Sequence, residues 1–117
     1  MRVIKASSIK NAPVSHGDVS NPAASKKVLL DRSYGIVGHM QMINWATLLP
    51  GREIMAHTHK DMYEIYVMIA GRGHMKVDDK DIDLERSDAL IIEPGELHQM
   101  INHGKEPIEF IAMGVVR

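Results

Sequence analysis

The chain has 117 residues, with 15 acidic and 14 basic side chains and a formal net charge of −1. This length suits a single domain that buries enough apolar surface to fold without a metal or a disulfide. Because the sequence contains no cysteine, it excludes disulfides, thiolate metal sites and cysteine nucleophiles. It has no excess of basic residues, so nucleic acid and anionic membrane surfaces are poor candidate partners.

Apolar residues occur in short runs along the whole sequence. The stretch from Phe110 to Val116 is among the longest, and it is far below the ~20 residues that span a bilayer. Residues 1–18 contain no apolar signal-peptide core. We therefore expect a cytoplasmic protein that does not associate with membranes.

Residues 1–25 are polar and are interrupted by Pro13, Gly17 and Pro22, which predicts an extended N-terminal arm. Over residues 26–117, short apolar and β-branched runs alternate with turn residues, a pattern typical of an all-β sandwich or barrel. No segment shows a sustained helical period. The pattern predicts strands at residues 26–31, 39–48, 54–57, 64–69, 73–77, 82–84, 89–93, 97–102 and 108–116.

Two histidines and a carboxylate, His57, His59 and Glu64, lie within eight residues of one another. Residues two apart point to the same face of a strand, so we expect the two imidazoles side by side. Glu64 begins the next predicted strand, and the intervening turn can bring its carboxylate back toward both rings. Such a set suits a divalent transition metal and leaves coordination positions open. His98, in a later predicted strand, is a fourth candidate ligand.

These residues follow the pattern of a known superfamily. The first motif of the cupins, G(X)5HXH(X)3,4E(X)6G, is matched over residues 51–71 at Gly51, His57, His59, Glu64 and Gly71. The second motif, G(X)5PXG(X)2H(X)3N, falls on residues 87–102 and is matched at Gly95, His98 and Asn102. Two positions depart from it, because Ser87 replaces the first glycine and Glu93 replaces the proline. The chain resembles a small single-domain cupin of the type-2, oxalate-decarboxylase-like kind, over about residues 38–117.

The resemblance implies an all-β fold, a single-domain cupin β-barrel of the jelly-roll or double-stranded β-helix type, over residues 26–117. It also implies one divalent transition metal per chain, manganese, iron, nickel or zinc, held by His57, His59, Glu64 and His98. Small cupins are often homodimers, so we expect a homodimer to whose interface the arm at residues 1–25 can contribute.

Strand parity places a further group of side chains beside the predicted ligands. We expect this group to line a substrate pocket, although it also fits an ordinary hydrophobic core; it comprises Met55, Tyr66, Met68, Met100, Asn102 and Phe110. Asn102 can alternatively shape the turn that follows it. Neither arginine nor lysine shares this parity, which argues against substrates that need a fixed cationic clamp, such as sugar phosphates.

Two residues are candidates for a catalytic group, namely Tyr66 and Glu93, and no other general base is identifiable. Glu93 also fits a solvated strand end. The remaining histidines lack neighbouring ligand-type residues and are interpreted as ordinary surface or loop side chains: His16, His39, His74 and His103.

The ligand set and the resemblance support two functional hypotheses. The first is a metal-dependent enzyme that acts on a small organic acid, enediol or aromatic compound by decarboxylation, isomerisation or oxygenation. The second is a non-catalytic module that binds or senses a small molecule. A structural or storage role is least favoured, because the predicted ligand set is complete in a short chain.

Overall fold

The computed structural model describes residues 2, 5–14, 16–34 and 39–117. No helix in this part of the chain is long and apolar enough to cross a membrane. Its regular elements, two 3₁₀ helices and nine strands, are η1 (Ala6–Ser8), β1 (Ala12–Pro13), β2 (Ala24–Asp31), η2 (Arg32–Tyr34), β3 (Met40–Leu48), β4 (Met62–Ala70), β5 (Gly73–Val77), β6 (Lys80–Leu84), β7 (Ala89–Ile92), β8 (His98–Ile101) and β9 (Ile108–Val116).

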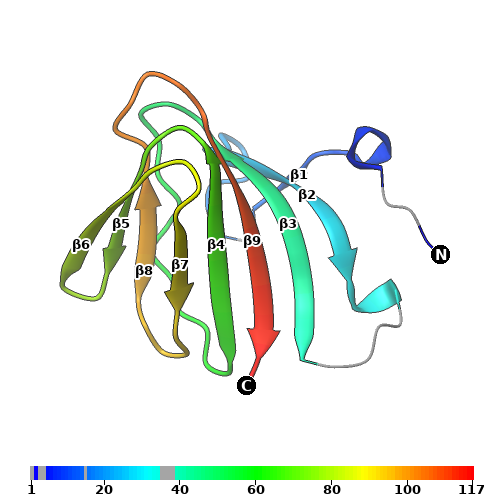
Figure 1. The fold of residues 1–117 in the computed structure, drawn as a ribbon. Coiled ribbons are helices and arrows are strands. Elements are labelled where there is room, and N and C mark those ends of the chain that lie inside the picture. Colours follow the sequence, from blue (N-terminus) through cyan, green and yellow to red (C-terminus); the bar gives the residue numbers. More distant parts are fainter. Residues whose placement is uncertain (1, 3–4, 15, 35–38) are drawn as a thin grey trace.

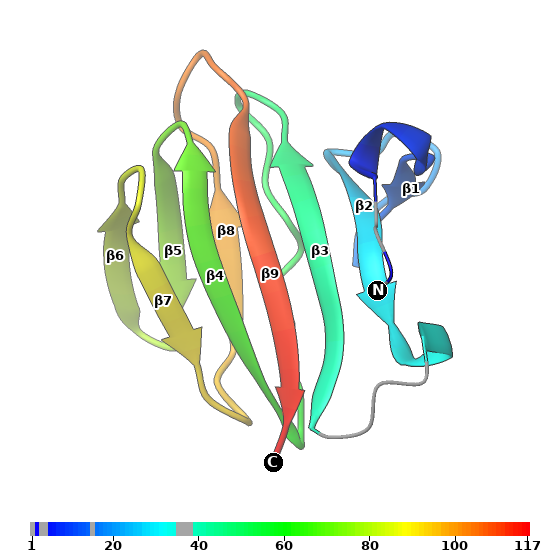
Figure 2. The ribbon, with the colours of Figure 1, turned by 45° about the vertical axis from the view of Figure 1, so that its right-hand side comes forward.

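The strands form two antiparallel sheets that face each other (Figure 1). The larger sheet has the strand order β1-β2-β3-β9-β4-β7, and the smaller sheet has the order β6-β5-β8. Figure 2 shows the smaller sheet behind the β7 and β4 side of the larger one. β9, the last strand in the sequence, lies between β3 and β4 and pairs with both.

Burial alternates along the central strands, as expected for strands with one face in a core. On β4, Glu64, Tyr66 and Met68 are buried, and the residues between them are half-buried. Tyr66 lies opposite Ala112 of β9, which in turn lies opposite Asn44 of β3. The inner faces of the two sheets meet in a hydrophobic core that includes Leu48, Met75, Ile92, Met100 and Ile108.

The predicted strand that carries His57 is instead an irregular segment beside β8. Two isolated bridges join it to that strand, Glu53 to Ile101 and His57 to His98. The bridges are four residues apart on one side (57 − 53) and three on the other (101 − 98), so one extra residue lies between them. This insertion has the character of a β-bulge, which interrupts the alternation of side chains and leaves Met55 59% exposed.

The other predicted strands are present, with ends within two residues of those predicted. The strands at residues 73–77 and 108–116 have the predicted bounds. Within the predicted arm, β1 pairs with the start of β2, Ala12 opposite Lys26 and Pro13 opposite Ser25. Part of the arm therefore extends the larger sheet by one short strand.

Candidate metal centre

The four predicted ligands come together at one end of the space between the sheets. One ligand atom from each of them lies within 4.8 Å of the others in a single group: His57, His59, Glu64 and His98. The Glu64 Oε2 atom is 3.0 Å from His59 Nε2 and 3.1 Å from His98 Nε2. Three imidazole nitrogens and one carboxylate oxygen form a donor set that suits a divalent transition metal, so the residues present fit such an ion.

Main-chain hydrogen bonds hold the two ligand-bearing segments against each other. The amide nitrogen of His57 donates to the His98 carbonyl oxygen at 3.1 Å, and the amide nitrogen of His98 donates to the His57 carbonyl at 3.0 Å. The Gly95 amide donates to the carbonyl of His59 at 2.8 Å. Glu64 is placed separately, by the inward face of β4. The two sequence motifs are thus joined through their backbones, which fixes the spacing of the imidazoles.

Two of the imidazole rings are oriented by backbone carbonyls. His57 Nδ1 lies 2.8 Å from the Met55 carbonyl oxygen, and His98 Nδ1 lies 2.9 Å from the Glu96 carbonyl oxygen. A carbonyl oxygen accepts hydrogen bonds only, so each Nδ1 carries the proton. The Nε2 atoms of both rings are thereby left to face the cluster, which is how second-layer hydrogen bonds orient metal ligands.

Opposing effects set the charges within the cluster. Burial favours a raised pKa for Glu64, but hydrogen bonds from His59 and His98 outweigh it and lower the pKa to about 2. Burial likewise opposes protonation of His98, and the Glu64 carboxylate overcomes this and raises the pKa of His98. Burial lowers the pKa of His57. At neutral pH Glu64 is ionised, and a cation at the cluster would replace the proton that it shares with the histidines.

A cavity of about 140 Å³ adjoins the cluster, with His57, His59 and Glu64 in its wall. The rest of the wall is mostly apolar, with side chains from the arm, from β3, β4 and β9 and from the segment between β3 and β4 that include Val14, Met42, Ala46, Ile54, Met62 and Ala112. Of the expected pocket residues, Tyr66 and Phe110 line it. The cavity is therefore small, predominantly apolar, and open to the proposed metal position on one side.

The structure differs from the expected pocket at the other four residues. Met55 lies outside the cavity because the bulge turns it to the surface. Met68 and Met100 belong to the hydrophobic core. Asn102 instead holds the turn after β8: its Nδ2 atom donates to the carbonyls of Leu48 and Glu106, at 3.1 and 2.8 Å, and its Oδ1 atom accepts from Gly104 N at 2.9 Å.

The two candidates for a catalytic group occupy different surroundings. Tyr66 is buried, and this burial, together with the negative charge of Glu64, raises the pKa of Tyr66 well above its usual value. Its hydroxyl therefore keeps its proton and acts as a hydrogen-bond donor rather than a base. Glu93 is exposed between β7 and β8, and it is not among the residues that line the cavity.

A lysine does line the cavity, contrary to the expectation from strand parity. Lys26 enters the wall from β2, where it lies opposite Ala46 of β3. Strand parity relates residues only along the ligand-bearing strands, whereas β2 reaches the cavity through its pairing with β3. The cavity thus has a cationic group in addition to the ionised Glu64.

His16, interpreted from the sequence as an ordinary surface or loop histidine, packs against the cluster. Its ring stacks on that of His57, with 3.9 Å between the ring centroids and an angle of 15° between the planes. Its centroid is 5.9 Å from that of His59. Burial, followed by the nearby imidazole of His59, lowers the pKa of His16. The sequence gives no sign of this contact, because the arm has no strand pattern that relates residue 16 to residue 57.

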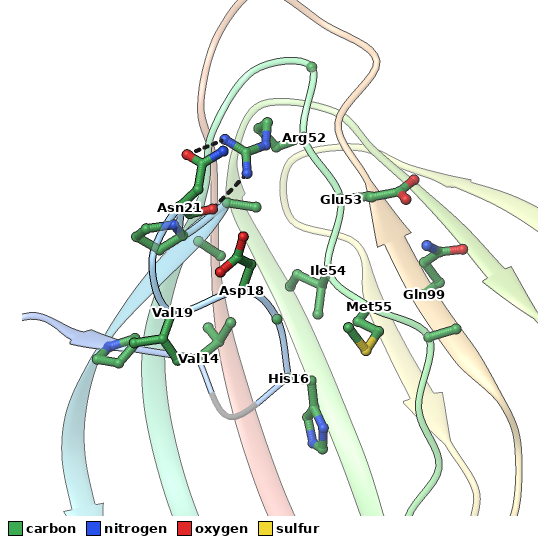
Figure 3. A pocket seen from close by; sticks show the side chains of 17 residues that line it. Val14, His16, Asp18, Val19, Asn21, Arg52, Glu53, Ile54, Met55 and Gln99 are labelled. Atoms are coloured by element: carbon green, nitrogen blue, oxygen red, sulfur yellow. Dashed lines mark hydrogen bonds between the residues drawn. The ribbon is translucent and has the colours of Figure 1, made fainter.

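The arm also forms one wall of a surface groove of about 660 Å³ (Figure 3). Residues 51–56 form the opposite wall. Arg52 joins the two walls, because its Nη2 atom donates to the Asn21 carbonyl at 2.8 Å. Val14, His16 and Ile54 line both the groove and the cavity, so the groove leads to the cluster.

Comparisons with known proteins agree with this geometry. The model of the cupin domain family matches residues 44–114. An oxalate-binding protein of Thermotoga maritima is 32% identical over 66 residues, which are 56% of this chain and 54% of that protein. The chain spans between 48% and 59% of the length of the curated relatives it matches.

Solved structures resemble the fold over nearly its whole length. A predicted oxalate decarboxylase from Thermotoga maritima has a TM-score of 0.83 at 23% identity, covering 99% of this chain and 100% of that one. The polyketide cyclase RemF from Streptomyces resistomycificus has a TM-score of 0.82 at 16% identity, covering 100% and 80% of the two chains. At these identities the likeness concerns the fold alone. With its double-stranded β-helix and a family match across more than half of its length, this chain belongs to the cupin family.

Proposed function

We propose that this chain is a metal-dependent enzyme that acts on a small organic acid. His57, His59, Glu64 and His98 would hold one divalent transition metal, and the adjoining cavity would hold the substrate. The observation that carries the proposal is the convergence of four ligand atoms within 4.8 Å in the wall of a 140 Å³ cavity.

When bound, a divalent metal supplies a Lewis acid that polarises substrate oxygens. Four protein ligands leave about two positions on a six-coordinate ion, enough for a bidentate acid or for substrate and water. Manganese, iron, nickel and zinc all accept this donor set. Decarboxylation, isomerisation and oxygenation are all compatible with such a centre, and enediols and aromatic compounds are the other substrate classes that it suits.

The chain's own residues favour an acid among these substrates. The Lys26 side chain brings a positive charge to the cavity and attracts an anion. Tyr66 retains its proton and helps to hold the Glu64 carboxylate in place. A cavity of about 150 Å³ accommodates a ligand of benzene's size, so this one suits a ligand of about six non-hydrogen atoms.

The second candidate function is a non-catalytic module that binds a small acid. The curated relative from Thermotoga maritima is named an oxalate-binding protein, which favours binding as much as turnover. Among the described residues in the cavity wall, Glu64 supplies the one carboxylate, and it belongs to the proposed ligand set. A binding module needs no general base. An enzyme would use a group of the wall other than Glu64 as its general base.

Elemental analysis of untagged protein, purified without chelator, tests the metal centre. We expect about one manganese, iron, nickel or zinc ion per chain, and we expect the His57→Ala/His59→Ala double variant to lose it. His74→Ala is the matched control, because His74 lies on β5, outside the cluster. Equal metal loss in the cluster and control variants would contradict the ligand assignment.

Turnover separates the two candidate functions. The metal-loaded protein is incubated with oxalate, and carbon dioxide release and oxygen uptake are recorded. A rate of release or of uptake above that of the double variant supports the enzyme. Tight binding of oxalate without any product supports the binding module. The homodimer and the cytoplasmic location stay predictions of the sequence, to be checked by light scattering and cell fractionation.

A further inference from the structure

The loop that carries His16 is held in place at both ends. Before it, Pro13 of β1 pairs with Ser25 of β2. After it, the guanidinium of Arg52 donates to the Asn21 carbonyl oxygen at 2.8 Å and lies 3.5 Å from the Asn21 side-chain oxygen. The Leu49 amide further donates to the Ala23 carbonyl at 3.0 Å. The position of His16 is therefore determined by contacts with the barrel on either side of it.

The ring of His16 lies on the face of the His57 ring rather than at its Nε2 atom. The angle of 15° between the planes and the centroid separation of 3.9 Å describe a parallel stack. His16 is consequently not part of the group of four converging ligand atoms. It nevertheless lines the cavity, so a molecule held there by the cluster meets the His16 ring.

The ring nitrogens of His16 form no hydrogen bond with any residue that the structure describes. An imidazole carries at least one N–H donor in either of its protonation states, so the His16 ring can donate a hydrogen bond into the cavity that it lines. His16 also lines both the groove and the cavity. Figure 3 shows its side chain among the residues of the groove.

We infer that the N-terminal arm is part of the substrate site and that His16 donates a hydrogen bond to an anionic oxygen of the bound acid. This inference rests on the proposed function. It makes His16 a substrate-positioning residue that is supplied from outside both sequence motifs. The stack against His57 holds the His16 ring beside the cluster, in the wall of the cavity.

The test is the affinity of zinc-loaded protein for oxalate, measured by titration calorimetry. Zinc is chosen because it is redox-inactive. His16→Phe keeps a flat ring that can stack on His57 but removes both nitrogens, and we expect its dissociation constant for oxalate to rise about tenfold while its zinc content is unchanged. His16→Gln restores a donor, and we expect most of the affinity to return. His103→Phe is the matched control, since His103 is exposed and lies outside the cavity wall.

Wild-type affinity for oxalate in His16→Phe would overturn the inference. Equal losses of affinity in His16→Phe and His16→Gln would overturn it as well, because the role of the arm would then be packing alone. A wild-type protein that binds zinc but not oxalate would overturn the inference and leave the metal centre in place. A wild-type protein that binds no divalent metal would contradict the proposed function, and the inference would fall with it.

Discussion

At the scale of single residues, two motif glycines share a backbone conformation but differ in their surroundings. Gly51 has a φ of +71° and Gly71 a φ of +81°, a region that L-residues rarely adopt. A Cβ atom added to Gly51 would meet nothing within 4 Å. At Gly71 the same atom would lie 2.7 Å from the Pro107 carbonyl oxygen and 3.1 Å from the Cα atom of Ile108. An alanine substitution at each position therefore separates the energetic cost of backbone strain, present at both, from that of steric overlap, present only at Gly71.

We expect Gly51→Ala to lower the free energy of unfolding by about 1 kcal/mol, the cost of an alanine in the left-handed region. Gly71→Ala should lower it by about 2–4 kcal/mol, because the backbone next to β9 must also move. Urea denaturation of the two variants and the wild type measures both losses. Equal losses would mean that the close approach of Gly71 to residues 107 and 108 has no energetic weight.

Ser87 shows how a motif position can keep its conformation after the residue has changed. Ser87 has a φ of +75°, in the region that suits the glycine of the second cupin motif. Two hydrogen bonds hold the turn, from Ser87 N to the Met68 carbonyl oxygen at 2.9 Å and from Asp88 N to the Glu85 carbonyl oxygen at 3.0 Å. The sequence identified the departure, and the structure adds that the surrounding turn imposes the unusual backbone on a serine.

At the scale of elements, the predictions succeeded where side-chain alternation is regular and failed where it is interrupted. β5 and β9 were predicted with the observed bounds, because their residues alternate about a buried face. The failure at Met55 has a local cause, the extra residue beside β8, which leaves no mark on the composition of the segment. Lys26 and His16 were missed for a different reason: pairings between distant segments bring them to the cavity.

The hairpin of β5 and β6 contains a histidine that can form ion pairs with two carboxylates. His74 of β5 lies between two carboxylates of β6, with Nδ1 2.7 Å from Asp83 Oδ1 and Nε2 2.8 Å from Asp81 Oδ1. Hydrogen bonds to Asp83 and then to Asp81 raise the pKa of His74 above its usual value of about 6.5. The stabilisation is complete below about pH 6.5 and is lost as the pH rises through the raised pKa.

We therefore expect the difference in unfolding free energy between wild type and His74→Gln to be largest below about pH 6.5 and to shrink as the pH rises through the raised pKa of His74. The change should be below about 1 kcal/mol, since both carboxylates are exposed and salt screens them. Urea titrations at several pH values measure it, and added salt should reduce it. Lys76→Gln removes a charge from the same strand and serves as control; a difference independent of pH would contradict the argument.

At the scale of the whole molecule, the barrel does not need the metal in order to fold. Its core of apolar side chains between the two sheets includes none of the four candidate ligands, so we expect a cooperative thermal transition in metal-free protein. Metal at 100 times its dissociation constant should add about 2.7 kcal/mol to the free energy of unfolding. For a chain of this size that raises the melting temperature by roughly 10 °C.

Calorimetry with and without chelator measures this shift. The His57→Ala/His59→Ala variant should melt cooperatively and show no response to metal. An unfolded metal-free protein would instead indicate that the cluster is a structural site.

The fold class and the four converging side chains were predictable, because the motif spacing encodes them. The cavity was not, since its wall combines the arm, β2, β3, the segment before β4, β4 and β9.

The place of β9 between β3 and β4 also governs the order in which the protein can be assembled during synthesis. β9 follows every other described strand, so a ribosome delivers β3 and β4 before the strand that joins them. Until then both strands present unpaired edges that can join with another nascent chain. A chain that stalls before Ile108 already carries every candidate ligand, yet it lacks Phe110 and Ala112, the part of the cavity wall that β9 supplies.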